Sequence, residues 1–330
     1  MNGVAARMRV AIRHMLIVMA VTGAGATAAL AQSGPWTERA YNPPVGSKWS
    51  IVSVSEGEEI RPPNGNRTQT IRTVSELTID EKLADGFRVS FVTRDLQMTG
   101  NTPGLEIAAT AFGAVKNIVV RARTDAAGKP VSVENLDEVK SVLKTVIDKV
   151  VESAKSNPQV AAVIRQMLEG MLVVDDKAAV KALMEDPIAL SGGQGTGLKP
   201  GAVKREADDL PSPLGGGVLK STLITRLSQW DDKAGTARVT RVREMDADAL
   251  KAVVVAIARK LSAAASDKVT PEVIEMMKKV SMDITSTTQY DTRDGMTMAI
   301  EDTGTTTASV TGITFKKFEK KMVTVTPMAK

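Results

Sequence analysis

The chemistry open to this chain is limited first by the residue types that it lacks. The sequence contains no cysteine, and its one histidine is His14. His14 lies within residues 1–31, which have the composition of a cleavable leader, so the mature chain is expected to contain neither residue type. This composition excludes a Ser-His-Asp triad, a thiolate nucleophile and a zinc site with histidine or cysteine ligands.

Carboxylates are the main remaining route to catalysis or metal binding, and they occur as close pairs at four places. The pairs are Asp175/Asp176, Asp208/Asp209, Asp231/Asp232 and Asp246/Asp248. The first and the last stand where a helix is predicted to begin, and an aspartate there caps the backbone and complements the helix dipole. The other two fall in a predicted linker and a predicted turn, and none fits a calcium-binding loop. A carboxylate site or a Ser-Lys pair stays formally open, but we predict a protein that is not an enzyme and has no catalytic residue, metal ligand or cofactor.

The densest cluster of charge is basic and lies near the end of the sequence. Its members Lys316, Lys317, Lys320 and Lys321 surround Phe318 and Glu319. Such lysines can contact an anionic surface such as lipid headgroups, or they can prevent an exposed edge strand from pairing with another sheet. Nucleic acid is not expected as a partner, because the cluster offers a single aromatic side chain for base stacking.

Residues 1–31 have the three parts of a secretory signal peptide. Three arginines form a basic start, residues 15–21 are apolar, and the segment ends in Ala29-Leu30-Ala31. A membrane anchor would need about 20 strongly apolar residues. We therefore expect cleavage after Ala31, a periplasmic or secreted protein, and no transmembrane segment in the mature chain. Removal of three arginines and no acidic residue lowers the formal charge from +5 to +2.

Two-residue alternation of apolar and polar side chains predicts strands over much of the chain. The clearest example is residues 87–91, where Phe87, Val89 and Phe91 alternate with Arg88 and Ser90. Glycines that end short Asp-containing turns, as at residues 125–128 and 293–295, predict hairpins between such runs. A hairpin is expected at about residues 118–135, and strands at about residues 49–55, 68–80, 87–98, 218–230, 236–244, 281–291, 296–302 and 313–326.

Helical periodicity replaces this alternation at residue 135. Leu136, Val139 and Leu143 recur at helical spacing through residue 154, and Asn135 with Glu138 matches a capping box. Further helices are predicted at residues 159–172, 176–185 and 247–264. Residues 191–217 are rich in glycine and proline and show no periodic apolar face, which predicts a linker or loop.

Strands and helices therefore occur in two blocks, residues 32–190 and 218–330, on either side of this linker. Each block has strands, then a capped amphipathic helix, then a helix led by Pro158 or Pro271. This order fits an internal duplication, and it also fits common β-α construction without shared ancestry. The two blocks could form two domains or one.

The expected fold class is α+β, with a mostly antiparallel curved sheet or incomplete β-barrel and two groups of covering helices. The leader, the long meandering strands and the hairpin-plus-helix of residues 118–143 resemble bacterial exported half-barrel proteins. The LolA-type lipoprotein carriers and the mycobacterial LppX/LprG lipid-binding proteins are of this kind. The resemblance implies a hydrophobic cavity between sheet and helices that holds acyl chains.

Two functional hypotheses follow from this fold. In the first, the protein is a non-enzymatic carrier of a lipid or other apolar ligand, and the helices line its cavity. The candidate lining residues are Leu143, Val146, Val150, Val254, Ile257 and Leu261. In the second, the same stripes pack into a filled core, and the protein is a structural or interaction protein of the cell envelope that binds a protein partner on its surface.

Overall fold

The computed structural model describes residues 36–61, 65–102, 104–113, 116–153, 165, 176–208, 210–211, 218–246, 248, 281–310 and 313–329. The predicted signal peptide lies outside these residues. So do the helix predicted at residues 159–172, except residue 165, and the helix predicted at 247–264, except residue 248.

Strands dominate the described residues. The strands are β1 (Lys48–Arg61), β2 (Gly65–Lys82), β3 (Gly86–Gly100), β4 (Val119–Asp125), β5 (Pro130–Val133), β6 (Val203–Ala207), β7 (Leu210–Pro211), β8 (Val218–Leu219), β9 (Ser221–Asp231), β10 (Thr236–Met245), β11 (Ser281–Arg293), β12 (Met296–Val310) and β13 (Ile313–Pro327). The helices are α2 (Leu105–Gly113), α3 (Leu136–Ser153), α5 (Asp176–Leu183) and α6 (Glu185–Ser191). None of these helices is long and apolar enough to cross a membrane.

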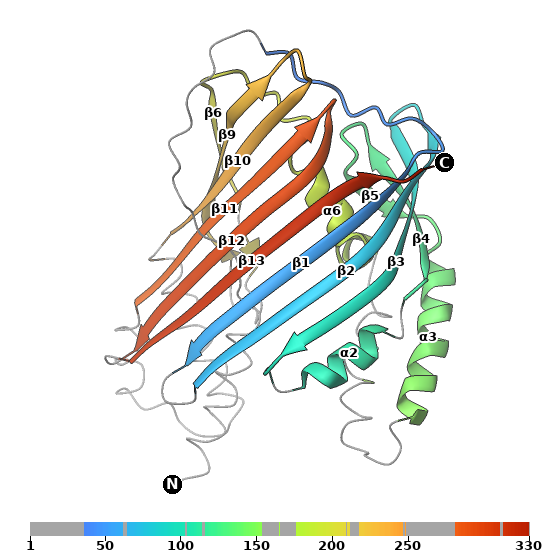
Figure 1. The fold of residues 1–330 in the computed structure, drawn as a ribbon, viewed down its shortest axis with the longest axis vertical. Coiled ribbons are helices and arrows are strands. Elements are labelled where there is room, and N and C mark those ends of the chain that lie inside the picture. Colours follow the sequence, from blue (N-terminus) through green and yellow to red (C-terminus); the bar gives the residue numbers. More distant parts are fainter. Residues whose placement is uncertain are drawn as a thin grey trace.

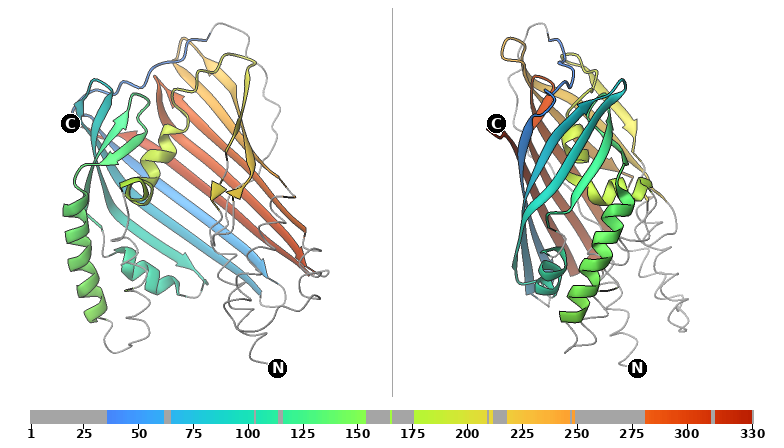
Figure 2. Two further views of the ribbon diagram at one scale, coloured as in Figure 1. Left: turned by 180° about the vertical axis from the view of Figure 1, so that it is seen from behind. Right: turned by 90° about the vertical axis from the view of Figure 1, so that its right-hand side faces the viewer.

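One antiparallel sheet of 11 strands contains both predicted blocks, in the order β5-β4-β3-β2-β1-β13-β12-β11-β10-β9-β6 (Figure 1). The first block supplies β1 to β5, and β9 to β13 come from the second. The blocks are joined by the pairing of β1 with β13, which runs without interruption from Trp49↔Pro327 to Ile60↔Lys316. The sheet is curved, and the helices lie on one side of it (Figure 2). The predicted mostly antiparallel curved sheet is confirmed, whereas the described residues do not show an internal duplication.

The face of the sheet toward the helices, here called the inner face, carries the core. Ile51 of β1 is fully buried between its cross-strand partners Ser75 and Val325, and Ile300 and Val323 continue the apolar layer. Met184 is also fully buried, in the same apolar cluster. A hydrogen bond from the Thr297 hydroxyl to the Leu190 carbonyl oxygen, 2.7 Å long, ties α6 to β12.

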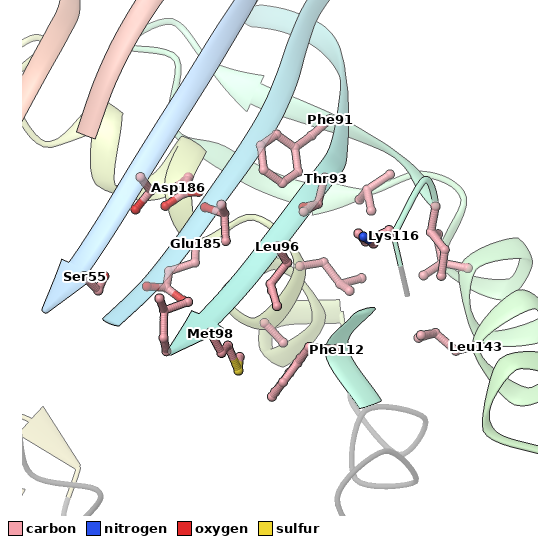
Figure 3. Close-up of a pocket in the computed structure, with 18 of the residues that line it drawn as sticks. Ser55, Phe91, Thr93, Leu96, Met98, Phe112, Lys116, Leu143, Glu185 and Asp186 are labelled. Atoms are coloured by element: carbon pink, nitrogen blue, oxygen red, sulfur yellow. The ribbon is translucent and has the colours of Figure 1, made fainter. Parts of the chain in front are cut away.

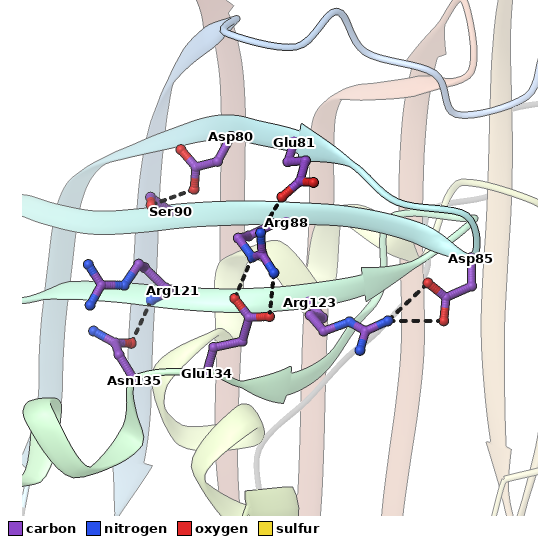
Figure 4. A network of polar contacts seen from close by, with 9 residues as sticks. All are labelled: Asp80, Glu81, Asp85, Arg88, Ser90, Arg121, Arg123, Glu134 and Asn135. Carbon is purple, nitrogen blue, oxygen red and sulfur yellow. Dashed lines mark hydrogen bonds and ion pairs between the residues drawn. The ribbon is translucent and has the colours of Figure 1, made fainter.

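The opposite, outer face of the first block is covered with ion pairs (Figure 4). Arg88 donates to Glu134 through its Nε at 2.7 Å and also pairs with Glu81. Arg123 pairs with Asp85 at 3.1 Å. Because Arg88 lies between the buried Phe87 and Val89, this pattern shows the two-residue alternation that predicted the strand.

The hairpin predicted at residues 293–295 joins β11 to β12. Asp294 and Gly295 both have positive φ, 48° and 79°, as a tight hairpin turn requires. A Cβ atom on Gly295 would lie 2.3 Å from the carbonyl oxygen of Ala40. Glycine is therefore needed here for close approach of the chain as well as for its backbone angle.

Three local features differ from the sequence analysis. Residues 203–207, within the predicted linker, form the edge strand β6, whose side chains are all exposed and so show no alternation. Helix α2 was not predicted. The helix predicted at 176–185 is α5, and α6 follows it at once. Pro187 is compatible with α6 because it lies in the first turn, where a backbone N–H has no helical partner.

Asn135 precedes α3, as predicted, but it does not form the expected capping box. Its side-chain oxygen accepts from the backbone N–H of Arg121 at 2.8 Å, and its amide donates to the Val119 carbonyl oxygen at 2.9 Å. The amide also donates to Glu138 at 3.2 Å. The side chain therefore fixes the start of α3 to strand β4 in place of capping the helix backbone.

Candidate ligand cavity

A cavity of about 350 Å³ lies between the inner face of β1–β3 and the covering helices, and it is called the apolar cavity here (Figure 3). Most of its walls are apolar side chains that come from the sheet, from α2 and α3, and from α5. These residues are Ile71, Phe91, Leu96, Met98, Phe112, Ile118, Val120, Val139, Leu143, Ala182 and Leu183.

A β-bulge in β3 directs two of these side chains into the cavity. The register shifts where Ser75 pairs with Thr93 but Val74 pairs with Asp95, which leaves Arg94 as an extra residue. Before the bulge, Phe91 and Thr93 face inward; after it, Leu96 and Met98 do (Figure 3). Without the extra residue, strand alternation would point Asp95 and Gln97 into the same space.

The remaining lining residues are polar and lie on the cavity floor or at its ends. Ser53, Ser55, Thr73 and Thr93 form small polar patches on the sheet. Lys116 lies at the end near α2, with its Nζ 3.5 Å from a carboxylate oxygen of Asp95. Glu185, Asp186 and Lys321 lie at the opposite end.

Lys321 of β13 is held by the first turn of α6. Its Nζ lies 2.9 Å from a Glu185 oxygen and 3.1 Å from an Asp186 oxygen. The Lys321 side chain is only 23% exposed. Burial acts to lower the pKa of this ammonium, but the charges of Asp186 and Glu185 outweigh burial and raise its pKa. The contact therefore anchors α6 to the sheet.

A second cavity, also about 350 Å³, lies beyond Lys321 and is called the polar cavity here. It shares Ser55, Ile71, Glu185 and Lys321 with the apolar cavity. The rest of its lining is largely charged or polar, and the charged residues on the inner-face strands are Glu59, Arg67, Asp302, Lys317 and Glu319. Glu56 and Lys320 also border it, although strand alternation directs their side chains to the outer face, where Lys320 pairs with Glu301 at 2.9 Å.

Asp302 is the carboxylate of the polar cavity whose environment is most altered. Burial raises its pKa to about 6, and a 3.0 Å hydrogen bond from the Thr288 hydroxyl and the charges of Lys321 and Arg243 offset part of that rise. Among the described residues there is no cluster of acidic or histidine side chains that could hold a metal ion. The polar cavity therefore contains side chains of both charges, and its described residues do not form a metal-binding cluster.

The structure brings together only part of the predicted lining set. Leu143 lines the apolar cavity. Val146, one turn further along α3, is half-buried and is not among the lining residues. The side chain of Val150 and the residues Val254, Ile257 and Leu261 lie outside the described part of the structure.

The four lysines of the basic cluster do not form one surface. Lys317 and Lys321 face inward, whereas Lys316 and Lys320 face outward, since β13 is regular throughout. Lys317, Lys320 and Lys321 each pair with a carboxylate. The interpretation that these lysines protect an edge strand is wrong, because β13 pairs with β1 on one side and β12 on the other.

Comparison with known proteins does not assign the chain to a family. No family model and no curated protein matches it. Among solved structures, lipovitellin, described by its lipid–protein interactions, is 10% identical with a TM-score of 0.40, over 87% of this chain and 26% of lipovitellin. DynF from the dynemicin biosynthesis pathway of Micromonospora chersina is 7% identical with a TM-score of 0.18, over 93% of this chain and 96% of DynF. An outer membrane channel from Pseudomonas putida F1 is 8% identical with a TM-score of 0.16, over 89% of this chain and all of the channel, 100%.

This chain thus spans about a quarter of the length of lipovitellin. Likenesses with TM-scores below 0.5 support no conclusion about ligand or activity.

Proposed function

We propose that this protein is a non-enzymatic binding or carrier protein that holds a lipid chain or another apolar ligand in the apolar cavity. The single observation that carries the proposal is the cavity's composition: 11 apolar residues, all but Ile118 from the sheet and three helices, surround about 350 Å³ of space. Small-molecule sites are typically apolar concavities of about 300–1,000 Å³ with a few polar groups. A filled core, as the surface-partner hypothesis requires, would leave no such space under these residues.

The walls favour a chain-like ligand because they present hydrocarbon without a pattern of directed hydrogen bonds. Phe91, Leu96, Met98 and Phe112 converge on the same space (Figure 3). Methionine and phenylalanine supply adaptable and large apolar surfaces, and burial of each ligand methylene against them contributes about 0.8 kcal/mol.

The sharpest test uses the neighbours Leu96 and Gln97, whose side chains point to opposite faces of β3. Leu96→Trp should fill part of the apolar cavity and weaken binding of a fluorescent fatty acid at least about tenfold, whereas Gln97→Trp should bind like the wild type. Both variants must show wild-type circular dichroism. If the wild-type protein binds no fatty acid, and if native mass spectrometry of protein from its own host shows no bound lipid, the proposal fails.

The proposal includes export, which rests on the leader alone. The mature chain should begin at Gln32, and N-terminal sequencing of protein from the periplasm or the medium tests this. An intact Met1 terminus in a membrane fraction would contradict it.

A further inference from the structure

The apolar and polar cavities meet along one row of cross-strand neighbours. Ile71, Ser55, Lys321 and Asp302 are successive partners across β2, β1, β13 and β12. The first three of them line both cavities. This row runs perpendicular to the strands. Along the strands, the inner face is largely apolar on one side of the row and charged on the other. A ligand that extends from one cavity into the other would meet hydrocarbon at one end and charge at the other.

The charged end contains groups of both signs at short range. Lys317 lies 2.6 Å from Glu319 on the same face of β13, and their side chains are 16% and 29% exposed. Lys321 and Asp302 are direct cross-strand partners. Glu319 is therefore flanked along β13 by two ammonium groups, with Asp302 on the neighbouring strand.

Glycines border Glu319 on both sides and open the floor of the polar cavity. Gly57 of β1 and Gly304 of β12 are its two cross-strand partners. At Gly57 neither backbone nor packing requires glycine. Its φ is not positive, the register is continuous there, and an added Cβ would find its nearest neighbour, the Gln69 carbonyl oxygen, at 3.9 Å. A glycine inside a strand weakens it, and without a bulge it often marks a tight bend of the sheet or close approach of a ligand or another backbone.

We propose that the polar cavity binds a zwitterionic headgroup, one with a phosphate-like anion and an ammonium, of an amphiphile whose chain lies in the apolar cavity. This inference rests on the proposed function. The anion would lie beside Lys317, since Lys321 is already held by Glu185 and Asp186. The ammonium would lie beside Glu319 and Asp302. A purely anionic headgroup over Gly57 would face Glu319, and a purely cationic one would face the two lysines. A headgroup of both signs places neither of its charges against a like charge, and unlike a neutral headgroup it can pair with both the lysine and the carboxylates.

The experiment compares four probes of matched chain length on the full mature chain. They are a lysophosphatidylethanolamine, a lysophosphatidic acid, an alkylamine and a fatty alcohol, each competing with a fluorescent fatty acid. The zwitterionic probe should bind at least about tenfold more tightly than the other three.

Gly57→Val should reduce the affinity of the zwitterionic probe at least about tenfold and leave that of the fatty alcohol unchanged. Its melting temperature should stay the same or rise, because valine favours strands and has room here. Glu58→Val, one residue along on the outer face, is the matched control and should bind every probe like the wild type. Lys317→Met provides a second variant, which should lose the preference for the zwitterion.

Each other outcome separates the two proposals. Equal affinity for all four probes, with no effect of Gly57→Val, would overturn the headgroup site and leave the apolar cavity standing. A large fall in melting temperature for Gly57→Val, with the headgroup preference retained in Lys317→Met, would show that the glycine serves sheet curvature and would also overturn it. If no probe binds the wild-type protein, the proposed function itself fails.

Discussion

The apolar and polar cavities occupy neighbouring parts of one sheet surface and have the same volume, yet their walls are held in different ways. The apolar cavity is enclosed by hydrophobic side chains of β2–β4 and of helices α2, α3 and α5. The polar cavity is bordered by charges that pair along β13 and with α6. The comparison shows that one face of a sheet can form two kinds of binding surface. Every second residue of a strand points to that face, and the residue type at each of these positions can differ independently.

The largest expected effect comes from placing charge in the apolar cavity. Leu143→Asp puts a carboxylate at a side chain that is 3% exposed and that packs among apolar lining residues of the cavity. It should lower the free energy of unfolding by about 3 kcal/mol or more. Its neighbour Lys144 is exposed, and Lys144→Asp should change stability little. Urea denaturation measures both. A loss below about 1 kcal/mol for Leu143→Asp would mean that water already enters this cavity.

The next effect concerns the anchor between the cavities. Lys321→Met removes the ammonium shared by Glu185 and Asp186 and leaves Asp302 beside an apolar side chain. We expect a loss of about 2 kcal/mol, below the full cost of breaking a buried pair because Glu185 is largely exposed. Lys320→Met, on the outer face, should leave the urea midpoint unchanged. Equal behaviour of the two variants would show that α6 does not depend on this contact.

Asp302 should give the polar cavity a pH dependence that the apolar cavity lacks. Its pKa rises from 3.8 to about 6 on folding, so the folded state binds more protons between these values. The wild-type protein therefore loses stability from this residue as pH rises from about 4 to about 6. Asp302→Asn removes that loss, and its stability relative to the wild type should increase across this window by about 1–2 kcal/mol, discounted for partial exposure.

Lys321, Arg243 and Glu319 are the charged groups that act on Asp302, and Thr288 is its hydrogen-bond donor. Chemical denaturation at several pH values, on wild type and variant together, checks the prediction. A difference in stability that is constant with pH would contradict it.

The smallest effect is expected on the outer face. Arg88 pairs with Glu81 and Glu134 in an exposed setting (Figure 4). Arg88→Met should leave the urea midpoint almost unchanged at moderate salt, since exposed ion pairs are screened by salt and by solvent. A clear loss that persists at high salt would show that the outer network, and not the inner face alone, holds β3 in register.

Local patterns predicted the elements well where one face is buried. Phe87, Val89 and Phe91 marked β3, and Asp294-Gly295 marked the turn between β11 and β12. Strand β6 gave no signal, because an exposed edge strand has no apolar face. The bulge at Arg94 does leave a trace in the sequence: inward apolar residues change from odd to even positions between Phe91 and Leu96.

The candidate site was less predictable than the fold, because its partners meet from distant parts of the sequence. Leu143 was selected from helical spacing alone, whereas Phe112 belongs to a short helix between strands that shows no such signal. The contact of Lys321 with Glu185 joins residues 136 positions apart. No local pattern indicates which lysine of a basic run faces a helix N-terminus across a sheet.

The pairing of β1 with β13 also determines the order in which this molecule can fold. In sequence order β1 is the first strand of the sheet. About half of its backbone hydrogen-bonding groups have their partners on β13, which is synthesised more than 250 residues later. Until then β1 presents an unpaired edge, and closing so long a loop slows folding and prolongs exposure to aggregation. A chain that emerges from a ribosome or a translocation pore from its N-terminus onward would therefore complete the centre of its sheet last.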